Sequence, residues 1–198
     1  TDQAAAYERD NPGKKVVAGI NADFFNMNTG EPSGAFVMDG VVHHEANGRP
    51  YFAILKDGTA TIRYGEDLSD VYQAVAGDQI LVKDGVAQEF VGDYATLKYS
   101  RAAIGIRADG SVVTYVTHGI SAPTSCGESY SDLAAMFVAQ GCVLALNVDG
   151  GGSATYASVR EGTNELKVQN NPSDGTPRTV STTLLFVSTA ASDGQFHH

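Results

Sequence analysis

The chain has 198 residues, enough for a single domain with a substantial hydrophobic core. Its 13 basic and 23 acidic residues give a formal net charge of −10, which argues against a nucleic-acid-binding protein because such proteins need a basic surface to neutralise phosphates. A ligand with one phosphate is compatible with this charge, since one or two arginines can hold it. No apolar stretch reaches the length of a transmembrane helix.

The first predicted elements are a helix and a strand. The helix covers residues 1–10 and ends at Asn11-Pro12-Gly13, because proline and glycine do not continue it. The strand covers residues 16–20, an apolar run that leads directly into Asn21-Ala22-Asp23-Phe24-Phe25.

Four hairpins are predicted next, because Asp-Gly recurs between apolar runs and accepts the positive φ of tight turns. The turns are Asp39-Gly40, Asp57-Gly58, Asp84-Gly85 and Asp109-Gly110. The paired runs are residues 34–38 with 41–42, 52–55 with 59–62, 79–82 with 86–90, and 103–106 with 112–116.

A second helix is predicted over residues 131–140, with Ser131 as its N-cap and Gly141 at its end. Its apolar face holds Leu133, Ala134, Phe137 and Val138. Strands over residues 143–148 and 183–187 complete the chain. The sequence therefore predicts a single α+β domain over residues 1–198, mostly antiparallel β-sheet with a few helices.

The two cysteines, Cys126 and Cys142, fit no zinc-site spacing. They are compatible with one disulfide and equally with two buried thiols.

Two segments share one arrangement, an apolar strand that ends in Asn-x-Asp. Alternate side chains of a strand share a face, so Asn21 should project with Asp23, and Asn147 with Asp149. A carboxylate beside a buried strand must be paired or hydrogen-bonded, and two such pairs predict one shared polar site. The alternative is that each aspartate only caps a turn.

Asp149 is followed by Gly150-Gly151-Gly152-Ser153. Such a run suits close approach of a ligand to the backbone, with N–H groups and the serine hydroxyl offered to an anion. It is not a P-loop, because the Gly-Lys-Ser/Thr ending is absent. The alternative is a flexible loop.

Two arginines and a histidine are further candidates. Arg101 shares a strand face with the small residues Ala103 and Gly105, which leave room for another group, although a solvated edge strand is the alternative. Arg178 lies just before the strand 183–187, where loop residues often serve sites. His118 ends a strand and is a possible acid or base, or an inert loop histidine.

Together these segments resemble the phosphodiester glycosidase family over residues 16–187. The resemblance rests on the order and approximate spacing of Asn21-Ala22-Asp23-Phe24-Phe25, Arg101-Ala102-Ala103-Ile104-Gly105, Asn147-Val148-Asp149-Gly150-Gly151-Gly152-Ser153 and Arg178-Thr179-Val180-Ser181. This chain has His118-Gly119-Ile120 where many members have Asp-Gly-Arg. Members usually carry more sequence before the first segment, so the resemblance leaves open whether residues 1–198 lack the domain's first strands.

The resemblance implies a secreted or cell-envelope hydrolase that cleaves the glycosidic bond of a sugar-1-phosphodiester, such as an N-acetylglucosamine-α-1-phosphate diester. The products would be free sugar and a phosphomonoester. The implied catalytic residues are Asp149, Asp23, Arg101 and Arg178. The implied substrate-binding residues are Asn21, Asn147, Gly150, Gly151, Gly152, Ser153, Ser181 and His118. A phosphorylated glycan is the implied partner, and no cofactor is implied.

Two other functions stay open at this stage. One is a non-catalytic envelope module that binds phosphosugar polymers in the same cleft. The other is a phosphodiesterase that cuts the P–O bond with Ca²⁺ or Mg²⁺, held by the oxygens of Asn21, Asp23, Asn147 and Asp149. The products of a sugar-1-phosphodiester would separate all three functions.

Overall fold

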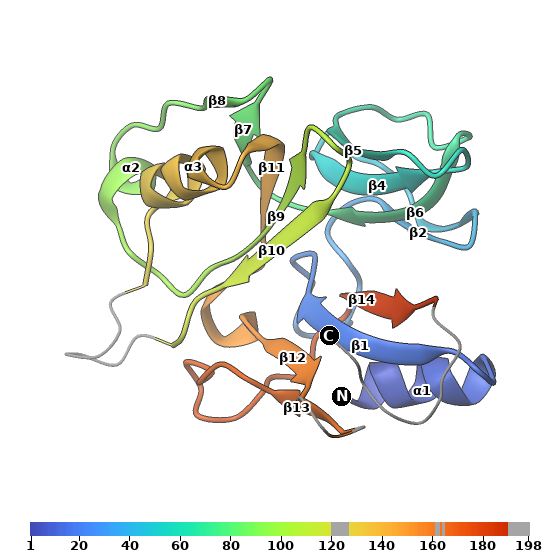
Figure 1. Ribbon diagram of the computed structural model, residues 1–198. Helices are drawn as coiled ribbons and strands as arrows, with labels where there is room; N and C mark the ends of the chain where they lie inside the picture. The colour runs from blue at the N-terminus through green and yellow to red at the C-terminus, as the bar shows by residue number, and fades with distance from the viewer. Residues whose placement is uncertain (120–126, 161–162, 164, 190–198) are drawn as a thin grey trace.

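The computed structural model describes residues 1–119, 127–160, 163 and 165–189, and within them the strands form three antiparallel sheets (Figure 1). The β1 sheet has the order β13 (Leu166–Val168), β12 (Tyr156–Val159), β1 (Lys15–Asn21), β14 (Thr183–Ser188). The β11 sheet has the order β10 (Val112–Val116), β9 (Ala102–Arg107), β11 (Cys142–Val148), β7 (Ile80–Lys83), β8 (Val86–Ala87). The β4 sheet has the order β3 (Val41–His44), β2 (Phe36–Met38), β6 (Val71–Ala76), β4 (Tyr51–Leu55), β5 (Ala60–Arg63).

All four predicted hairpins are confirmed. They pair β2 with β3, β4 with β5, β7 with β8 and β9 with β10. Asp39 and Asp84 adopt positive φ angles of 52° and 53°, and the glycines that follow them are also left-handed, which is the backbone of a two-residue hairpin turn. The α+β class with mostly antiparallel sheet is therefore correct.

The helices are α1 (Asp2–Asp10), α2 (Asp93–Thr96) and α3 (Tyr130–Ala139), and α3 begins earlier than predicted. Ser129, and not Ser131, is its N-cap: the Ser129 hydroxyl accepts from the Asp132 N–H, and the Asp132 carboxylate accepts from the Ser129 N–H. This reciprocal capping box explains the start. Val138 is 38% exposed, so its predicted place on the buried face was wrong.

The main core lies where the three sheets meet. Ile20 of β1, Phe52 of β4 and Leu146 of β11 are all buried in it. Because β1 and β11 both end at this core, its packing fixes the positions of the polar residues at the two strand ends. No helix within the described residues is both long and apolar enough to cross a membrane.

Helix α3 packs on the opposite face of the β11 sheet, over the small residues of β9. A Cβ on Gly105 would lie 2.6 Å from Phe137 Cδ1 and 2.8 Å from Cys142 Sγ. The room predicted beside Arg101 is thus filled by Phe137 and Cys142. Cys142 is buried there, whereas Cys126 lies outside the described residues, so the structure does not address a disulfide between them.

Candidate functional site

The ends of β1 and β11 meet directly, although they belong to different sheets. The Asp149 N–H donates to the Ala22 carbonyl at 2.9 Å. The Asn21 amide donates to the Asp149 carbonyl at 2.6 Å. Asp23 and Asp149 therefore leave two strands at the same place, as the repeated Asn-x-Asp pattern predicted.

Asp23 is a buried carboxylate, with only 2% of the residue exposed. Its Oδ2 accepts from the Gly34 N–H at 2.7 Å, and Arg49 Nη2 lies 3.5 Å from Oδ1. Its own N–H donates to the Thr182 hydroxyl at 3.0 Å. Burial raises the pKa of Asp23 to about 6, although Arg49 and the neighbouring N–H groups oppose that rise.

Asp149 is half-buried and therefore more accessible than Asp23. Burial raises its pKa, while the Ser153 hydroxyl, the Gly150 N–H and the charges of Arg178 and Arg49 lower it. The Gly150 N–H donates to Asp149 Oδ1 at 2.9 Å. The Ser153 hydroxyl is near enough to affect Asp149, but its oxygen is buried without a hydrogen bond of ordinary geometry to any described residue.

The glycine run has a packing reason at two positions. Gly150 passes close to Ser100, which precedes β9, and a Cβ would lie 2.5 Å from the Ser100 carbonyl oxygen. The next N–H, of Gly151, donates to that same oxygen at 2.8 Å. At Gly152, a Cβ would collide with the Arg178 guanidinium and the Asp174 carboxylate. The run is thus a compact turn, η1 (Gly151–Ser153), and not a loose loop.

We expect Gly152→Ala to lower activity by about tenfold or more, because the new methyl group displaces Arg178 from its position beside Asp149. Unfolding should be little affected, since the colliding atoms are the ends of two half-exposed side chains. Steady-state kinetics and thermal melts check both parts. Unchanged kinetics would show that the position of Arg178 does not matter.

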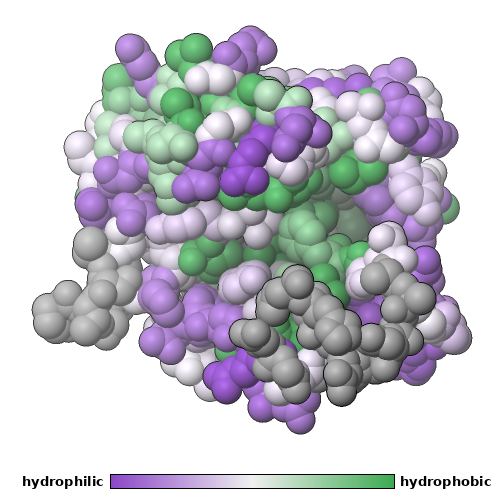
Figure 2. Space-filling model, viewed as in Figure 1, coloured by the Kyte–Doolittle hydropathy of each residue, from purple (hydrophilic) through white to green (hydrophobic). Residues whose placement is uncertain are grey.

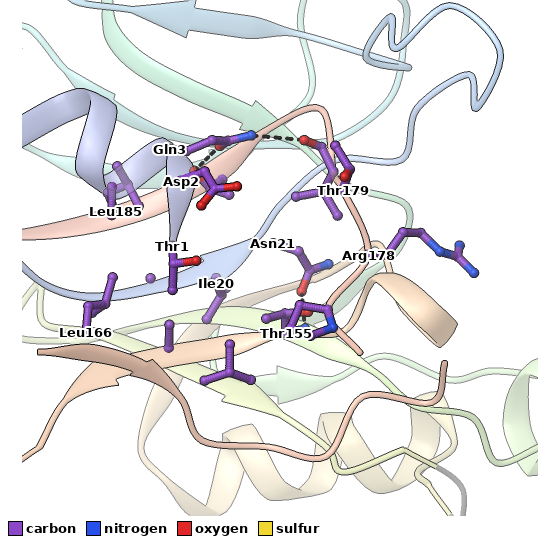
Figure 3. Close-up of a pocket in the computed structure, with 17 residues that line it drawn as sticks. Thr1, Asp2, Gln3, Ile20, Asn21, Thr155, Leu166, Arg178, Thr179 and Leu185 are labelled. Atoms are coloured by element: carbon purple, nitrogen blue, oxygen red, sulfur yellow. Dashed lines mark hydrogen bonds between the residues drawn. The ribbon is translucent and has the colours of Figure 1, made fainter. Parts of the chain in front are cut away.

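Arg178 is held by an acidic neighbour that the sequence analysis did not single out. Its Nε and Nη2 donate to Asp174 Oδ2 at 3.0 and 2.7 Å. Figure 3 shows the Arg178 side chain pointing away from the cavity formed by the β1 sheet and the start of α1. Its charge still reaches Asp149, whose pKa it lowers.

Arg101 has a different environment. Its guanidinium carbon lies 4.2 Å from the centre of the Tyr130 ring and 5.1 Å from that of Tyr99. Its Nε donates to the Glu128 carbonyl at 3.1 Å. The structure thus holds Arg101 between aromatic rings, close to Gly150 through its backbone. A catalytic role for Arg101 stays a prediction.

The remaining predicted residues make hydrogen bonds to backbone groups of the protein. Asn147 is buried and donates to the Val148 carbonyl at 2.9 Å, and its Oδ1 has no partner among the described residues. The Ser181 hydroxyl donates to the Gly30 carbonyl at 2.6 Å. His118 Nδ1 accepts from the Asn171 N–H at 3.1 Å. Their roles in substrate binding stay predictions.

Asn21 is a poor candidate for a metal ligand. The Asn21 side-chain oxygen accepts from the Thr155 N–H at 3.0 Å, and its amide donates to Asp149. Asp23, Asp149 and the Asn147 side-chain oxygen remain as the oxygen donors of the proposed set. Within the described part of the chain, no three His, Cys, Asp or Glu side chains cluster as a metal site would require.

Sequence reasoning missed Arg49, Thr182 and Asp174. Arg49 follows a turn in a segment that predicts no strand, so only the tertiary structure brings it to Asp23. Asp174 is likewise placed by a loop. Thr182 was within reach of sequence reasoning, because it directly follows Arg178-Thr179-Val180-Ser181.

Two cavities adjoin this site, but neither contains the carboxylates. One, of about 350 Å³, lies on the outer face of the β1 sheet and reaches Asn21, Thr155 and Arg178 (Figure 3). The other, of about 550 Å³, lies between α1, β14 and the β4 sheet and is mainly apolar. Apolar side chains are recessed near the middle of the face seen in Figure 2. We place the site at the carboxylates, because there the buried charges and the strand ends converge.

Comparison with known proteins gives matches over most of the chain. The family model described as phosphodiester glycosidase matches residues 14–187. An uncharacterized SPbeta prophage-derived protein, YomE of Bacillus subtilis, is 33% identical over 187 residues, covering 86% of this chain and 28% of the relative. Mouse N-acetylglucosamine-1-phosphodiester alpha-N-acetylglucosaminidase is 28% identical over 159 residues, covering 69% of this chain and 30% of that enzyme.

Two solved structures share the fold. One is the catalytic domain of zebrafish N-acetylglucosamine-1-phosphodiester alpha-N-acetylglucosaminidase, auto-inhibited by its pro-peptide, with a TM-score of 0.74 and 23% identity over 87% of this chain and 63% of that one. The other is a hypothetical protein from Synechocystis, with a TM-score of 0.64 and 13% identity over 93% of this chain and 53% of that one. The chain spans less than a third of the curated relatives' length. With the family model matching from the strand β1 to the strand β14, the chain belongs to the phosphodiester glycosidase family.

Proposed function

We propose that this protein hydrolyses the glycosidic bond of a sugar-1-phosphodiester, such as an N-acetylglucosamine-α-1-phosphate diester, and releases free sugar and a phosphomonoester. The observation that carries the proposal is the convergence of Asp23 and Asp149 at the joined ends of β1 and β11, with Arg49 and Arg178 beside them. Family membership supplies the reaction type. An extracellular or cell-envelope location is part of the same proposal.

Asp149 is the carboxylate best placed to act on the anomeric carbon. It is half-buried beside the glycine turn, so a sugar can approach it, whereas Asp23 has almost no exposed surface. A carboxylate there can stabilise the oxocarbenium-like transition state, or attack the anomeric carbon or activate water. Water adds its oxygen to the sugar, and the bond from the anomeric carbon to the phosphate oxygen breaks.

The leaving phosphate carries negative charge, which cations in the site stabilise as the bond breaks. A phosphomonoester is already a fair leaving group, so the demand for a strong acid is smaller than in ordinary glycosidases. The pKa of Asp23, about 6, leaves that carboxyl partly protonated near neutral pH. Asp23 can therefore gain or lose a proton near neutral pH while it stays buried.

The other two functions have weaker support. A metal-dependent phosphodiesterase would need oxygen ligands from Asn21, yet that side chain is already bonded to Thr155 and Asp149. A non-catalytic binding module would not need two carboxylates whose pKa values are raised by burial, because uncharged groups bind sugars without that desolvation cost.

Incubation with an N-acetylglucosamine-1-phosphodiester, followed by assays of reducing sugar and phosphomonoester, tests the proposal. Equal amounts of both products are expected. Release of N-acetylglucosamine-1-phosphate would indicate P–O cleavage instead. Binding without turnover would favour the non-catalytic module.

A further inference from the structure

Arg101 and Arg178 lie near the glycine turn and Arg49 lies near Asp23, and the environments of the three guanidinium groups differ. Arg101 is stacked between Tyr130 and Tyr99 and bonded to the Glu128 carbonyl. Arg178 already donates two hydrogen bonds to the Asp174 carboxylate. Arg101 is therefore held against aromatic rings, and Arg178 is already paired with a carboxylate.

One hydrogen bond fixes the position of the Arg49 side chain, and part of its guanidinium remains available to a ligand. Its Nε donates to the Gly77 carbonyl at 2.9 Å, and its guanidinium lies 5.1 Å from the centre of the Phe24 ring. Its Nη2 is 3.5 Å from Asp23 Oδ1, a long contact, and Nη1 makes no hydrogen bond to a described residue. The side chain is 29% exposed, whereas that of Asp23 is 1% exposed.

The anchor of Arg49 lies at the end of β11. A Cβ on Gly77 would lie 2.5 Å from the Asn147 carbonyl oxygen, and the next N–H, of Asp78, donates to that oxygen at 2.9 Å. Packing of the β4 sheet therefore places Arg49 close to the end of β11, the strand that leads into Asp149. The charge of Arg49 lowers the pKa of both Asp23 and Asp149, so it acts on both carboxylates.

We infer that Arg49 is the principal phosphate-binding residue of this site, and that Asp23 is the buried counter-ion that orients it. The inference rests on the proposed function for the identity of the substrate, but the ligand chemistry is that of a phosphate in general. Arginine suits this task because its planar guanidinium donates two parallel hydrogen bonds to phosphate oxygens. Binding takes place next to Asp149, where the leaving group of a sugar-1-phosphodiester would lie.

Arg49 interacts electrostatically with both carboxylates of the site. Asp23 and Asp149 are its carboxylate neighbours, and Arg178 is the other cation that acts on Asp149. Because Asp174 neutralises Arg178, loss of Arg49 would leave the carboxylates to repel an incoming phosphate. Arg49→Gln should therefore weaken phosphate binding strongly and raise KM more than it lowers kcat.

The test is a ³¹P NMR titration of the whole chain with inorganic phosphate and with methyl phosphate, which needs no turnover. Arg49→Gln should weaken binding at least about tenfold, the loss expected for one charge-assisted contact. Arg49→Lys should fall in between, because it keeps the charge but not the two parallel donors. Circular dichroism and thermal melts establish that each variant is folded.

Arg63→Gln is the matched control. Arg63 also lies over an aromatic ring, 5.8 Å from the centre of Tyr51, and it also pairs with an aspartate, Asp70. It lies on β5, away from the carboxylates, so its phosphate affinity should equal that of the unmodified chain.

Wild-type affinity in folded Arg49→Gln would overturn the inference, as would an unmodified chain that binds neither phosphate. An equal loss in Arg63→Gln would also overturn it. If Arg49→Gln does not fold, the phosphate affinity of folded Arg49→Lys is the test. Wild-type affinity in that variant would overturn the inference, and weaker binding would support it. Phosphate binding through Arg49 without turnover of the diester would refute the proposed function alone.

Discussion

Asp149→Asn should reduce the rate of diester hydrolysis by about a hundredfold or more, with little change in melting temperature. The substitution removes the charge and keeps the shape. The hydrogen bond that the carboxylate accepts from the Gly150 N–H, at 2.9 Å, can be accepted equally by an asparagine oxygen. Steady-state kinetics and a thermal melt measure the two effects together.

Asp109→Asn is the control for this variant. Asp109 also precedes a glycine and also accepts a backbone N–H, that of Ser111 at 2.9 Å, but it lies in an exposed hairpin turn. Both the activity and the melting temperature of Asp109→Asn should stay close to those of the unmodified chain. Near-normal activity in Asp149→Asn would mean that Asp149 only shapes the turn, and the chemistry would then have to be assigned to Asp23.

Asp23→Asn should make the protein more stable at neutral pH while lowering its activity by about tenfold or more. The pKa of Asp23 is about 6 in the folded chain, above its ordinary value of 3.8. Its contribution to stability is therefore fully present below about pH 3.8 and is lost as the pH rises to about 6. At about 1.4 kcal/mol for each pKa unit, the charged carboxylate costs up to about 3 kcal/mol above pH 6.

Urea denaturation of both proteins at several pH values measures this difference. The free energy of unfolding of Asp23→Asn should exceed that of the unmodified chain at pH 7.5, and the two should converge near pH 4. Activity should fall because Arg49 loses its counter-ion. A variant that is less stable at pH 7.5 would show that the Asp23–Arg49 ion pair outweighs the cost of burying the charge.

Local sequence signals predicted most of the fold. The four Asp-Gly turns and the apolar runs beside them specify the hairpins, because turn geometry and strand alternation are local properties. Strands β6, β12 and β13 were not predicted. Each of them lacks an Asp-Gly turn. Strand β6 pairs with β2 and β4, and β12 pairs with the distant β1 as well as with its chain neighbour β13. The start of α3 was misplaced because Ser129 and Ser131 are both good caps, and only Ser129 has Asp132 at the reciprocal position.

The site was predictable where it follows from the ends of strands and not where it depends on packing between sheets. Asn21-Ala22-Asp23 and Asn147-Val148-Asp149 could be compared as patterns, so the meeting of the two aspartates was foreseen. Arg49 could not be foreseen, because it reaches Asp23 only after the β4 sheet packs against the end of β11 at Gly77. The pairing of Arg178 with Asp174 likewise depends on how one loop folds over Gly152.

Hydrolysis of an N-acetylglucosamine-1-phosphodiester in ¹⁸O-labelled water, followed by ³¹P NMR of the phosphomonoester, tests the central claim most directly. Cleavage between the anomeric carbon and oxygen places the label on the sugar, so the phosphorus signal of the product should show no isotope shift. An ¹⁸O-shifted phosphorus signal would mean that water attacked phosphorus, and it would contradict the assignment of Asp149 to chemistry at the anomeric carbon.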